Sequence, residues 1–429
     1  MAFLSALFVL ALACANYVMH HDVMYPGFLQ ASLWFVAIVL ALVGHGLFVP
    51  VSGTVFVLIT SGVVFFSMGA FVGSYNHRPY LGRNYVLQGT VPTPRSVAVL
   101  VAIVALGLIL YVDRVLYLSS SGPSTNAFVN LRYAVSVNQD ETGGIGFVQY
   151  FVMLANVLAA IAVLQRHRVT NRAGSRILVV GAILIALAFG VLSSGRGPVL
   201  ALVLLVLAIP VVLRATRASK AFGGLVLVTL LLFVTVGVAL GKGGSLENSI
   251  AENWVTMRES FLTYTVGGIP ALGLFLDNRG SELEWGFNSF RSVFAVLKAL
   301  GFDTTVAPLV QPYVDTPIPF NAFTIYQPYI KDFGLFGAAP VLFVLGFLHA
   351  MVYRRATVRH PHAMFVFLYA LSLFPLVMQV FQDMYFSLLS LWCQYAIYAV
   401  VFFVFLSGRS ENTTGDTPSH PSLLVGQRA

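Results

Sequence analysis

The chain has 429 residues, of which 58% are hydrophobic and only 9% are charged, and its mean hydropathy is +0.86. This composition leaves too few polar side chains to cover a water-soluble globule, so it excludes a soluble fold and predicts a polytopic membrane protein. The net charge of +8 falls in short basic clusters between apolar segments. Such clusters are typical of membrane topology signals, and we expect no nucleic-acid partner.

Apolar segments of about 17 to 25 residues recur along nearly the whole chain, which predicts an all-α fold. We expect one transmembrane helical domain, 1–406, and a disordered cytoplasmic tail, 407–429. The first segment lacks the basic start of a signal peptide, so it reads as a retained helix. Cys14 and Cys393 lie inside apolar segments and are expected in the core. About eleven spans are predicted: 2–18, 28–48, 52–73, 96–117, 147–165, 177–194, 198–213, 221–240, 335–353, 363–381 and 386–406.

Orientation follows from four connections that carry Lys or Arg and no acidic residue: 74–95, 166–176, 214–220 and 354–362. By the positive-inside rule these connections are cytoplasmic. The connections between them, 118–146, 193–197 and 241–334, then face the periplasm. The tight turn at 192–199 predicts a helical hairpin.

The connection 241–334 is expected to be a folded, partly helical periplasmic loop, because it holds nine of the sixteen acidic residues. A capping-box pattern at Ser249 and Glu252 starts a helix that 267–270 ends. A second helix is expected from Asn288 as its cap to Gly301. The apolar positions recur at helical spacing in both: Ile250, Trp254, Met257, Phe261 and Tyr264 in the first, and Phe290, Phe294, Leu297 and Leu300 in the second.

A candidate anion site lies in 193–198, Ser-Ser-Gly-Arg-Gly-Pro. Pro198 suits the first turn of a helix, so the free N–H groups and the positive dipole end of that helix lie beside Arg196. The alternative is a tight turn with an arginine that snorkels to the membrane surface.

Four other arginines are expected on the periplasmic side. A guanidinium keeps its charge and binds phosphate oxygens through paired hydrogen bonds, which suits a pyrophosphate. For any one of them a surface salt bridge is the competing explanation. Arg258 is the strongest candidate because it lies on the predicted amphipathic helix; the others are Arg132, Arg279 and Arg291.

Asp332 lies where the loop re-enters the membrane and is the leading carboxylate. It could act as general base towards a sugar hydroxyl, or it could cap the start of the following helix. Gln379, Gln382 and Asp383 either line a cavity or satisfy one another between helices. Weaker acidic candidates are Glu259, Asp277, Glu282 and Glu284.

The loop 241–334 contains no histidine and no cysteine, so composition excludes a zinc site or a histidine base there. We therefore expect neither a metal nor a cofactor.

Several motifs, taken in order, resemble the bacterial oligosaccharide repeat-unit polymerases of the Wzy type. They are Ser194-Gly-Arg-Gly197 opening a long apolar helix, Tyr264 with Gly267-Gly268 in a large outer loop, Asn321-Ala-Phe-Thr324, and Tyr329-Ile-Lys-Asp-Phe-Gly334 leading into the next helix. The likeness covers about 147–406, and the first four spans contribute only hydrophobicity to it.

The resemblance implies a glycosyltransferase of the bacterial inner membrane that polymerises undecaprenyl-pyrophosphate-linked repeat units at the periplasmic face, during O-antigen or exopolysaccharide synthesis. It implies partners in a chain-length regulator and a flippase of the same pathway, besides membrane lipids. Arg196 and Arg258 would bind the pyrophosphate, and Asp332 would be the base or orient the substrate. Substrate-binding roles would fall to Arg279, Arg291, Arg132, Tyr264, Asn321, Thr324 and Tyr329.

Three alternatives remain open, one of them a non-catalytic assembly partner in polysaccharide export. The related O-antigen ligases share the plan, but they are associated with a loop histidine that this chain lacks. A transporter or flippase of lipid-linked oligosaccharide would explain the many spans, but it predicts two matching halves and short loops.

Overall fold

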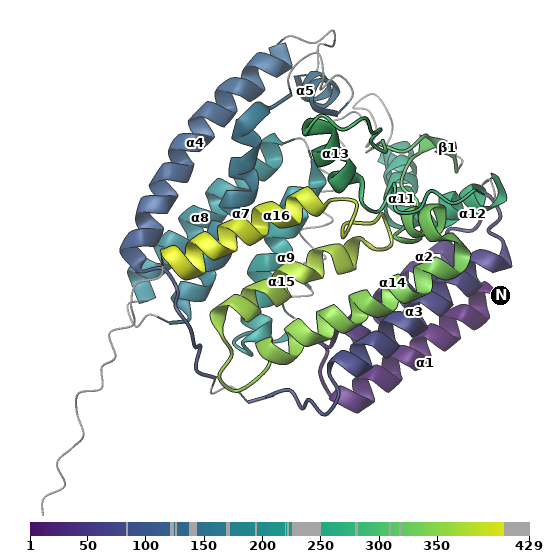
Figure 1. Cartoon of the computed structure of the whole chain (residues 1–429), viewed down its shortest axis with the longest axis horizontal. Coiled ribbons are helices and arrows are strands. Elements are labelled where there is room, and N and C mark those ends of the chain that lie inside the picture. The colour runs from purple at the N-terminus through teal and green to yellow at the C-terminus, as the bar shows by residue number, and fades with distance from the viewer. Residues whose placement is uncertain are drawn as a thin grey trace, which may run out of the picture.

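The structure, a computed structural model, is a bundle of long helices with a smaller helical layer at one end (Figure 1). In lipid, backbone polar groups must be satisfied within the chain, which is why apolar segments of this length form helices. The structure describes residues 1–406 except 83–84, 121–123, 125–126, 137–143, 169–171, 194, 219, 221–222, 225–249, 279–281, 309 and 317–318. The predicted tail 407–429 and, except for 223–224, the predicted span 221–240 lie outside the described residues.

Seven described helices are long and apolar enough to cross a membrane. They comprise α1 (Ala2–His20), α2 (Pro26–Val43), α3 (Gly53–Gly73), α4 (Pro94–Ser120), α7 (Tyr150–Arg166, preceded by the 3-10 turn η1, Gly146–Gln149), α8 (Arg172–Leu192) and α14 (Tyr326–Ala356). The predicted spans at 198–213, 363–381 and 386–406 are shorter apolar helices: α9 (Arg196–Val212), α15 (Ala363–Met378) and α16 (Leu389–Val400), which continues as the π-helical turn η2 (Val401–Phe405). The α8–α9 hairpin predicted at 192–199 is present.

The closest helix packing joins α3 to α14, through glycines. A Cβ atom added to Gly69 would overlap the carbonyl of Phe343, and one added to Gly346 would overlap the carbonyl of Phe66. Small residues let membrane helices approach until their backbones touch. α1 and α2 pack beside this pair, whereas α4, α7, α8, α9 and α16 form the other side of the bundle (Figure 1).

The basic connections meet at one end of the bundle, as expected for connections predicted to face the same side of the membrane. Backbone hydrogen bonds join Tyr80 to Thr357 and Val86 to Arg359, and the Tyr85 hydroxyl lies 3.1 Å from His167 Nδ1. The 74–95, 166–176 and 354–362 connections are therefore neighbours. We call this end the basic end.

A buried ion pair adds two further connections to the basic end. Arg214 bonds both carboxylate oxygens of Asp22, at 3.0 and 2.5 Å, and the Tyr353 hydroxyl donates to the same carboxylate at 2.6 Å. Asp22 lies in the connection between α1 and α2. This connection contains no Lys or Arg, so the positive-inside rule does not orient it. The pair places the α1–α2 connection at the basic end.

The opposite end carries the segment 250–334. It contains α11 (Ile250–Val266), α12 (Gly268–Asn278), α13 (Arg291–Ala299) and a two-stranded antiparallel sheet, β1 (Val314–Asp315) with β2 (Pro319–Phe320). Figure 1 shows these elements gathered together, and α5 (Ala127–Ser136) lies near the same end. The first predicted helix is confirmed as α11. α12 was not predicted, and the residue before α13 is Phe290 rather than the predicted cap Asn288.

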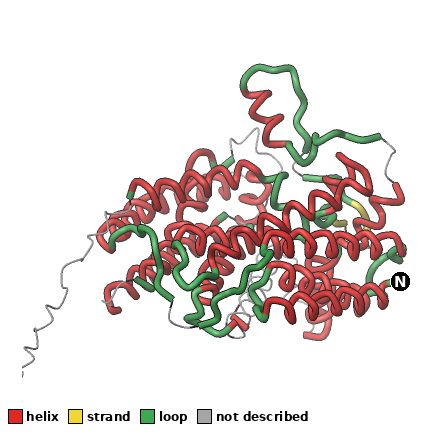
Figure 2. The backbone as a smooth tube through the Cα atoms, turned by 60° about the horizontal axis from the view of Figure 1, so that its bottom comes forward, coloured by secondary structure: helices red, strands yellow, loops and turns green. Residues whose placement is uncertain are grey.

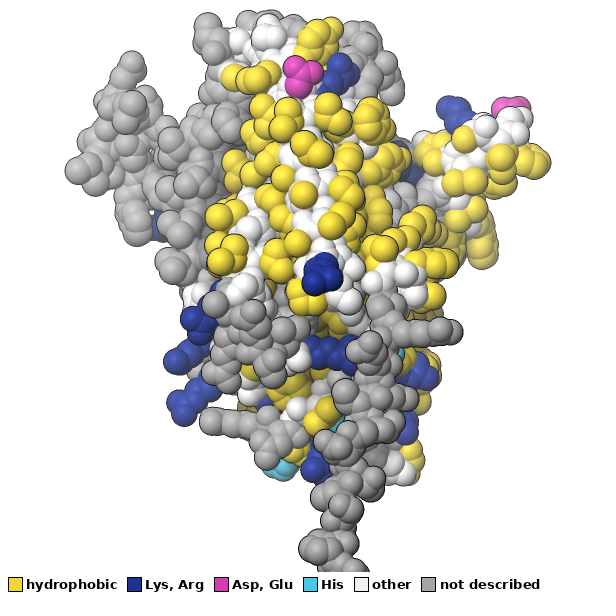
Figure 3. All heavy atoms as spheres, turned by 90° about the vertical axis from the view of Figure 1, so that its left-hand side faces the viewer, with side chains coloured by type: hydrophobic (Ala, Val, Ile, Leu, Met, Phe, Trp, Pro, Cys, Tyr) yellow, Lys and Arg dark blue, Asp and Glu magenta, His cyan; other side chains and the backbone are white. Residues whose placement is uncertain are grey.

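The outer surface of the bundle is an apolar belt. Figure 3 shows the face that carries α4, where hydrophobic side chains fill the middle and most Lys and Arg side chains lie below it. The exposed residues of α4 include Ile103, Leu106, Ile109 and Leu110. Cys14 and Cys393 are also exposed, so their predicted core position is wrong. Hydropathy does not separate lipid-facing from core positions in a membrane helix, because both are apolar.

Candidate functional site

Asp332 is fully buried, at 0% exposure, and its carboxylate is occupied by hydrogen bonds. Oδ1 accepts from the backbone N–H and the side-chain amide of Asn288, at 3.1 and 2.8 Å. Oδ2 accepts from the backbone N–H of Ser289 at 2.6 Å. A buried charge is tolerated when such donors surround it. The carboxylate therefore fastens the turn before α13 to α14.

The prediction that Asp332 caps a membrane helix is wrong. α14 already begins at Tyr326, and its regular turns are interrupted at Gly334, where φ is 76°. A residue with a side chain strongly disfavours that conformation, so glycine is needed for the bend. Two helical segments therefore meet at Gly334, and the second begins at about 335, as predicted for this span. The Asp332 oxygens accept from Asn288 and Ser289 rather than from its first turn, so only the predicted cap fails.

Hydrogen bonds also fix the backbone at Asp332. The N–H groups of Glu284 and Trp285 donate to the carbonyls of Lys331 and Asp332, at 3.0 and 3.1 Å. This pairing brings 284–285 alongside the amino-terminal part of α14. It places Glu284 and Lys331 together at the edge of a cavity.

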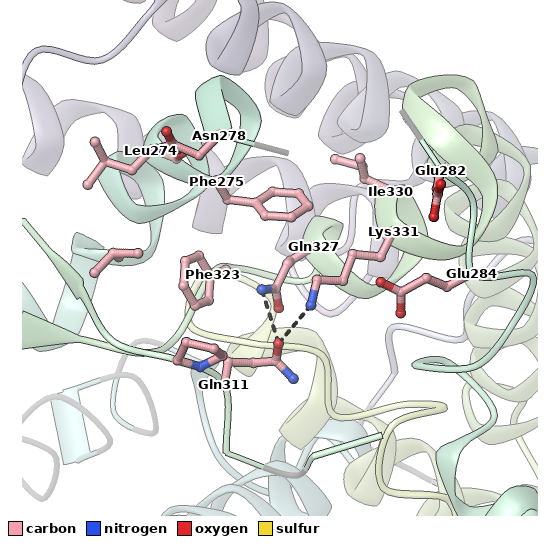
Figure 4. A pocket seen from close by; sticks show the side chains of 12 residues that line it. Leu274, Phe275, Asn278, Glu282, Glu284, Gln311, Phe323, Gln327, Ile330 and Lys331 are labelled. Atoms are coloured by element: carbon pink, nitrogen blue, oxygen red, sulfur yellow. Dashed lines mark hydrogen bonds between the residues drawn. The ribbon is translucent and has the colours of Figure 1, made fainter. Parts of the chain in front are cut away.

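The cavity has a volume of about 420 Å³ and lies between α12, α14 and the loop around residue 311 (Figure 4). Its walls combine two phenylalanine rings with amide, carboxylate and ammonium groups. Pockets of this kind use apolar walls for burial and a few polar groups for orientation. The lining residues are Leu274, Phe275, Asn278, Glu282, Glu284, Gln311, Pro312, Val314, Phe323, Gln327, Ile330 and Lys331.

The polar groups of the cavity are partly connected to one another. Gln311 Oε1 accepts from Gln327 Nε2 at 3.4 Å and from Lys331 Nζ at 3.1 Å. Figure 4 shows Glu284 on the same side as Lys331. Glu284 also accepts from the Asn288 amide at 2.7 Å, so Asn288 links the cavity edge to Asp332.

A second polar network lies beside Thr324, at the turn between α15 and α16. The Tyr329 hydroxyl donates to Asp383 Oδ1 at 2.9 Å, and Gln379 Oε1 accepts from Trp34 and Gln30 at 3.3 and 3.2 Å. Burial raises the pKa of Asp383, and the hydrogen bonds to its carboxylate oppose that shift. Gln379 and Asp383 thus bond partners on other parts of the chain rather than each other, and neither lines the cavity beside α14.

Several motif residues of 264–324 pack into one unit. Thr324 holds a positive φ of 62°, and its backbone N–H donates to the Phe381 carbonyl at 3.0 Å. A Cβ atom on Gly268 would lie 2.7 Å from the carbonyl of Val380. The Tyr264 ring contacts Phe320, and Asn321 directly follows β2. Their positions are explained by packing, and none of Tyr264, Asn321 or Thr324 lines the cavity.

The structure describes the side chains of only some of the predicted arginines. Arg258 is exposed on α11, and Arg291 Nε donates to the Ala307 carbonyl at 2.7 Å. Arg196 opens α9 and Arg132 lies on α5, but their side chains lie outside what is described, as does the whole of Arg279. The predicted meeting of Arg196, Arg258 and Asp332 stays a prediction.

A second cavity, of about 680 Å³, lies at the basic end between α7, α8 and α9, and Arg166, His167 and Arg176 line it. The described residues hold no group of three or more His, Cys, Asp or Glu side chains placed to bind a metal ion. Comparison of the chain with protein-family models, curated proteins and solved structures finds no match. The candidate site therefore rests on its own geometry.

Sequence reasoning missed most of this site. It ranked Glu282 and Glu284 below Asp332, and it assigned no role to Lys331. Gln311 and Gln327 carry no local signal, because an isolated glutamine in a loop or helix is usually solvated. Only the fold brings these residues to one cavity.

Proposed function

We propose that the protein is a membrane glycosyltransferase that transfers glycan between lipid-linked oligosaccharides, at the end of the bundle that carries 250–334. The observation that supports this most directly is the cavity beside α14. It offers the rings of Phe275 and Phe323 together with amide and carboxylate groups, a combination that suits a sugar. The resemblance of the ordered motifs to repeat-unit polymerases favours polymerisation over the other transfers.

The transfer needs a proton acceptor and a site for a departing pyrophosphate. An acceptor hydroxyl attacks the anomeric carbon, the bond to the pyrophosphate oxygen breaks, and the hydroxyl proton passes to a base. Glu284 or Glu282 would take that proton, because both carboxylates border the cavity. Lys331 would orient the acceptor. Asp332, whose oxygens accept three hydrogen bonds, would act as a positioning residue.

The departing pyrophosphate is an anion that fixed positive charge stabilises. We propose Arg196 and Arg258 for this role, with Arg279 or Arg291 assisting. The basic end would face the cytoplasm and the cavity the periplasm of a bacterial inner membrane, since positive charge collects on the cytoplasmic side.

The test is glycan lengthening by the purified full chain in lipid nanodiscs, supplied with lipid-linked repeat units and no nucleotide sugar. We expect a ladder of longer glycans from the wild-type protein. Glu284→Gln should slow it about 100-fold or more, the range for loss of a general base. The matched control is Glu259→Gln on α11, outside the cavity lining, and it should leave the rate unchanged.

Other outcomes separate the alternatives. Translocation of intact lipid-linked oligosaccharide across vesicles without lengthening would indicate a transporter. Transfer to a different lipid acceptor without a ladder would indicate a ligase. A ladder that Glu284→Gln and Glu282→Gln both leave unchanged would remove the cavity from the reaction.

A further inference from the structure

α13 projects from the body of the protein. None of its residues is buried, and Figure 2 shows a short helix and the loop after it standing clear of the other helices. Figure 3 shows the same feature as a lobe at the side whose surface is mostly hydrophobic. A helix without a buried residue that still exposes large apolar side chains needs a partner to cover them.

The apolar residues of α13 fall into two stripes. Phe294 faces the body, where its ring contacts Phe287 at 5.6 Å between centroids. Val296 and Leu300 are exposed, at 59% and 69%, and with Val293 they follow a spacing of three and four along the other stripe. Lys298 lies across the helix from Val296. The outward face is therefore apolar and the basic residue lies away from it.

The base of α13 lies beside the exposed apolar surface of α14. The turn before α13 packs on the bend of α14, because Leu283 lies beside Gly334 and Phe290 lies over Gly286 next to Phe333. Directly after the bend, Phe336 is 91% exposed, in a helix that is long and apolar enough to span the membrane. The side of α14 that faces lipid therefore leads directly to the base of α13.

Exposed aromatic residues occur both before and after α13. Trp285 is 75% exposed, and Phe302 and Tyr313 are exposed as well. Tryptophan and tyrosine are enriched where membrane meets water, since their rings are apolar and their edges are polar. A short amphipathic helix with a basic residue on its polar side lies in that interface with its apolar face in the acyl region.

We propose that α13 is an interfacial membrane anchor. Val293, Val296 and Leu300 enter the outer edge of the lipid bilayer on the side of α14, and Lys298 meets the headgroups. This inference is independent of the proposed glycosyl transfer. It identifies the occupant of the exposed stripe as lipid, rather than a second copy of the chain or another protein.

The test places an environment-sensitive fluorophore at single cysteines of the full chain in nanodiscs. Cys14 and Cys393 are first replaced by serine, because both are exposed. The probe is attached at Val296→Cys, at Lys298→Cys on the opposite face, and at Leu348→Cys on the lipid-facing side of α14 as a positive control. Phospholipids brominated on their acyl chains serve as the quencher.

We expect brominated lipid to quench the probe at 296 nearly as strongly as at 348 and to leave the probe at 298 bright. Equal quenching at 296 and 298, or none at 296, would overturn the proposal. A probe at 296 that is shielded from water but not quenched would indicate a protein partner and would overturn it too.

A second variant guards against a label that disturbs α13. Val296→Asp with Leu300→Asp should abolish quenching of a probe at Val293→Cys, while the spans keep the chain inserted and the probe at 348 stays quenched. Unchanged quenching at 293 in this variant would contradict insertion of the stripe.

Discussion

The two ends of the helix bundle use their buried polar groups differently. At the basic end, Asp22 and Arg214 bind each other, and Tyr353 completes the pair. At the opposite end, Asp332 is buried as a structural anchor, while Glu284 and Lys331 are turned towards a cavity. The comparison indicates that the buried ion pair at the basic end joins helices, whereas at the opposite end a buried anchor lies next to charged groups that border a cavity.

The largest expected effect is at the basic end. Asp22→Ala leaves Arg214 without its carboxylate in a site where Asp22 is almost fully buried. Removal of one partner from a fully buried pair costs about 3–5 kcal/mol, and the partial exposure of the remaining Arg214 places this variant near the lower value. The measurement is reversible unfolding in mixed micelles. Arg359→Gln, an exposed arginine at the same end, should change the free energy of unfolding by less than about 0.5 kcal/mol. Equal effects of the two variants would show that the ion pair does not hold this end together.

Next in size is Asp332→Ala, which should cost about 2–3 kcal/mol, since hydrogen bonds to a charged group are the stronger kind. The loss should be local: hydrogen exchange at the amides of Asn288 and Ser289 should speed up far more than exchange in α3. Asp303→Ala, an exposed carboxylate after α13, is the control. If Asp332→Asn keeps normal exchange yet abolishes transfer, Asp332 is a catalytic residue after all, and the division between anchor and cavity fails.

Sequence alone predicted the elements whose signal is local. The spacing of apolar residues placed α11 correctly at 250–266, and the short turn at 192–199 predicted the α8–α9 hairpin. It missed α12, because Gly268 and Pro270 were read as a helix end although proline also fits a first helical turn. The α13 prediction was right in its periodicity, but the pattern alone did not show that one apolar stripe stays exposed.

The site was less predictable than the fold, for a physical reason. Asp332 meets Asn288, and Tyr329 meets Asp383, across long separations in sequence that no local pattern encodes. Mean hydropathy identified the spans but could not assign lipid-facing and core positions, as the exposed Cys14 and Cys393 demonstrate. The sequence pattern therefore identified candidate polar residues. Only the packing of the helices showed which of them fasten the structure and which border the cavity.

A smaller effect is expected from Tyr329→Phe, which removes one neutral hydroxyl bonded to Asp383. A hydrogen bond to a carboxylate is worth about 1.5–3 kcal/mol, and we expect about 1.5 kcal/mol here because Asp383 keeps its other donors and the ring stays packed. Unfolding in mixed micelles measures the change, and Tyr313→Phe, at an exposed loop position, should have no effect. A cost equal to that of Asp22→Ala would mean that the α15–α16 turn is as important to the bundle as the basic end.

The smallest effect is a pH dependence at the basic end. Burial, with smaller contributions from the nearby positive charges of Arg354 and His20, lowers the pKa of His77 from 6.5 to about 4, and Asp22 opposes the shift. A histidine with a lowered pKa binds its proton less readily in the folded chain than in the unfolded chain. Its contribution to stability is therefore complete above pH 6.5 and is lost as the pH falls towards 4.

Between pH 7 and pH 5, the melting temperature of the wild-type protein should therefore fall further than that of His77→Gln. Glutamine can still bond the Thr357 hydroxyl, which lies 2.9 Å from His77 Nε2, so the variant removes the titration while a hydrogen bond remains. His360→Gln, an exposed histidine in the neighbouring connection, should behave as wild type. If acid lowers the melting temperatures of the His77 variant and the wild-type protein equally, protonation of another group destabilises the protein. The contacts between 74–95 and 354–362 would then not be the acid-sensitive part of the structure.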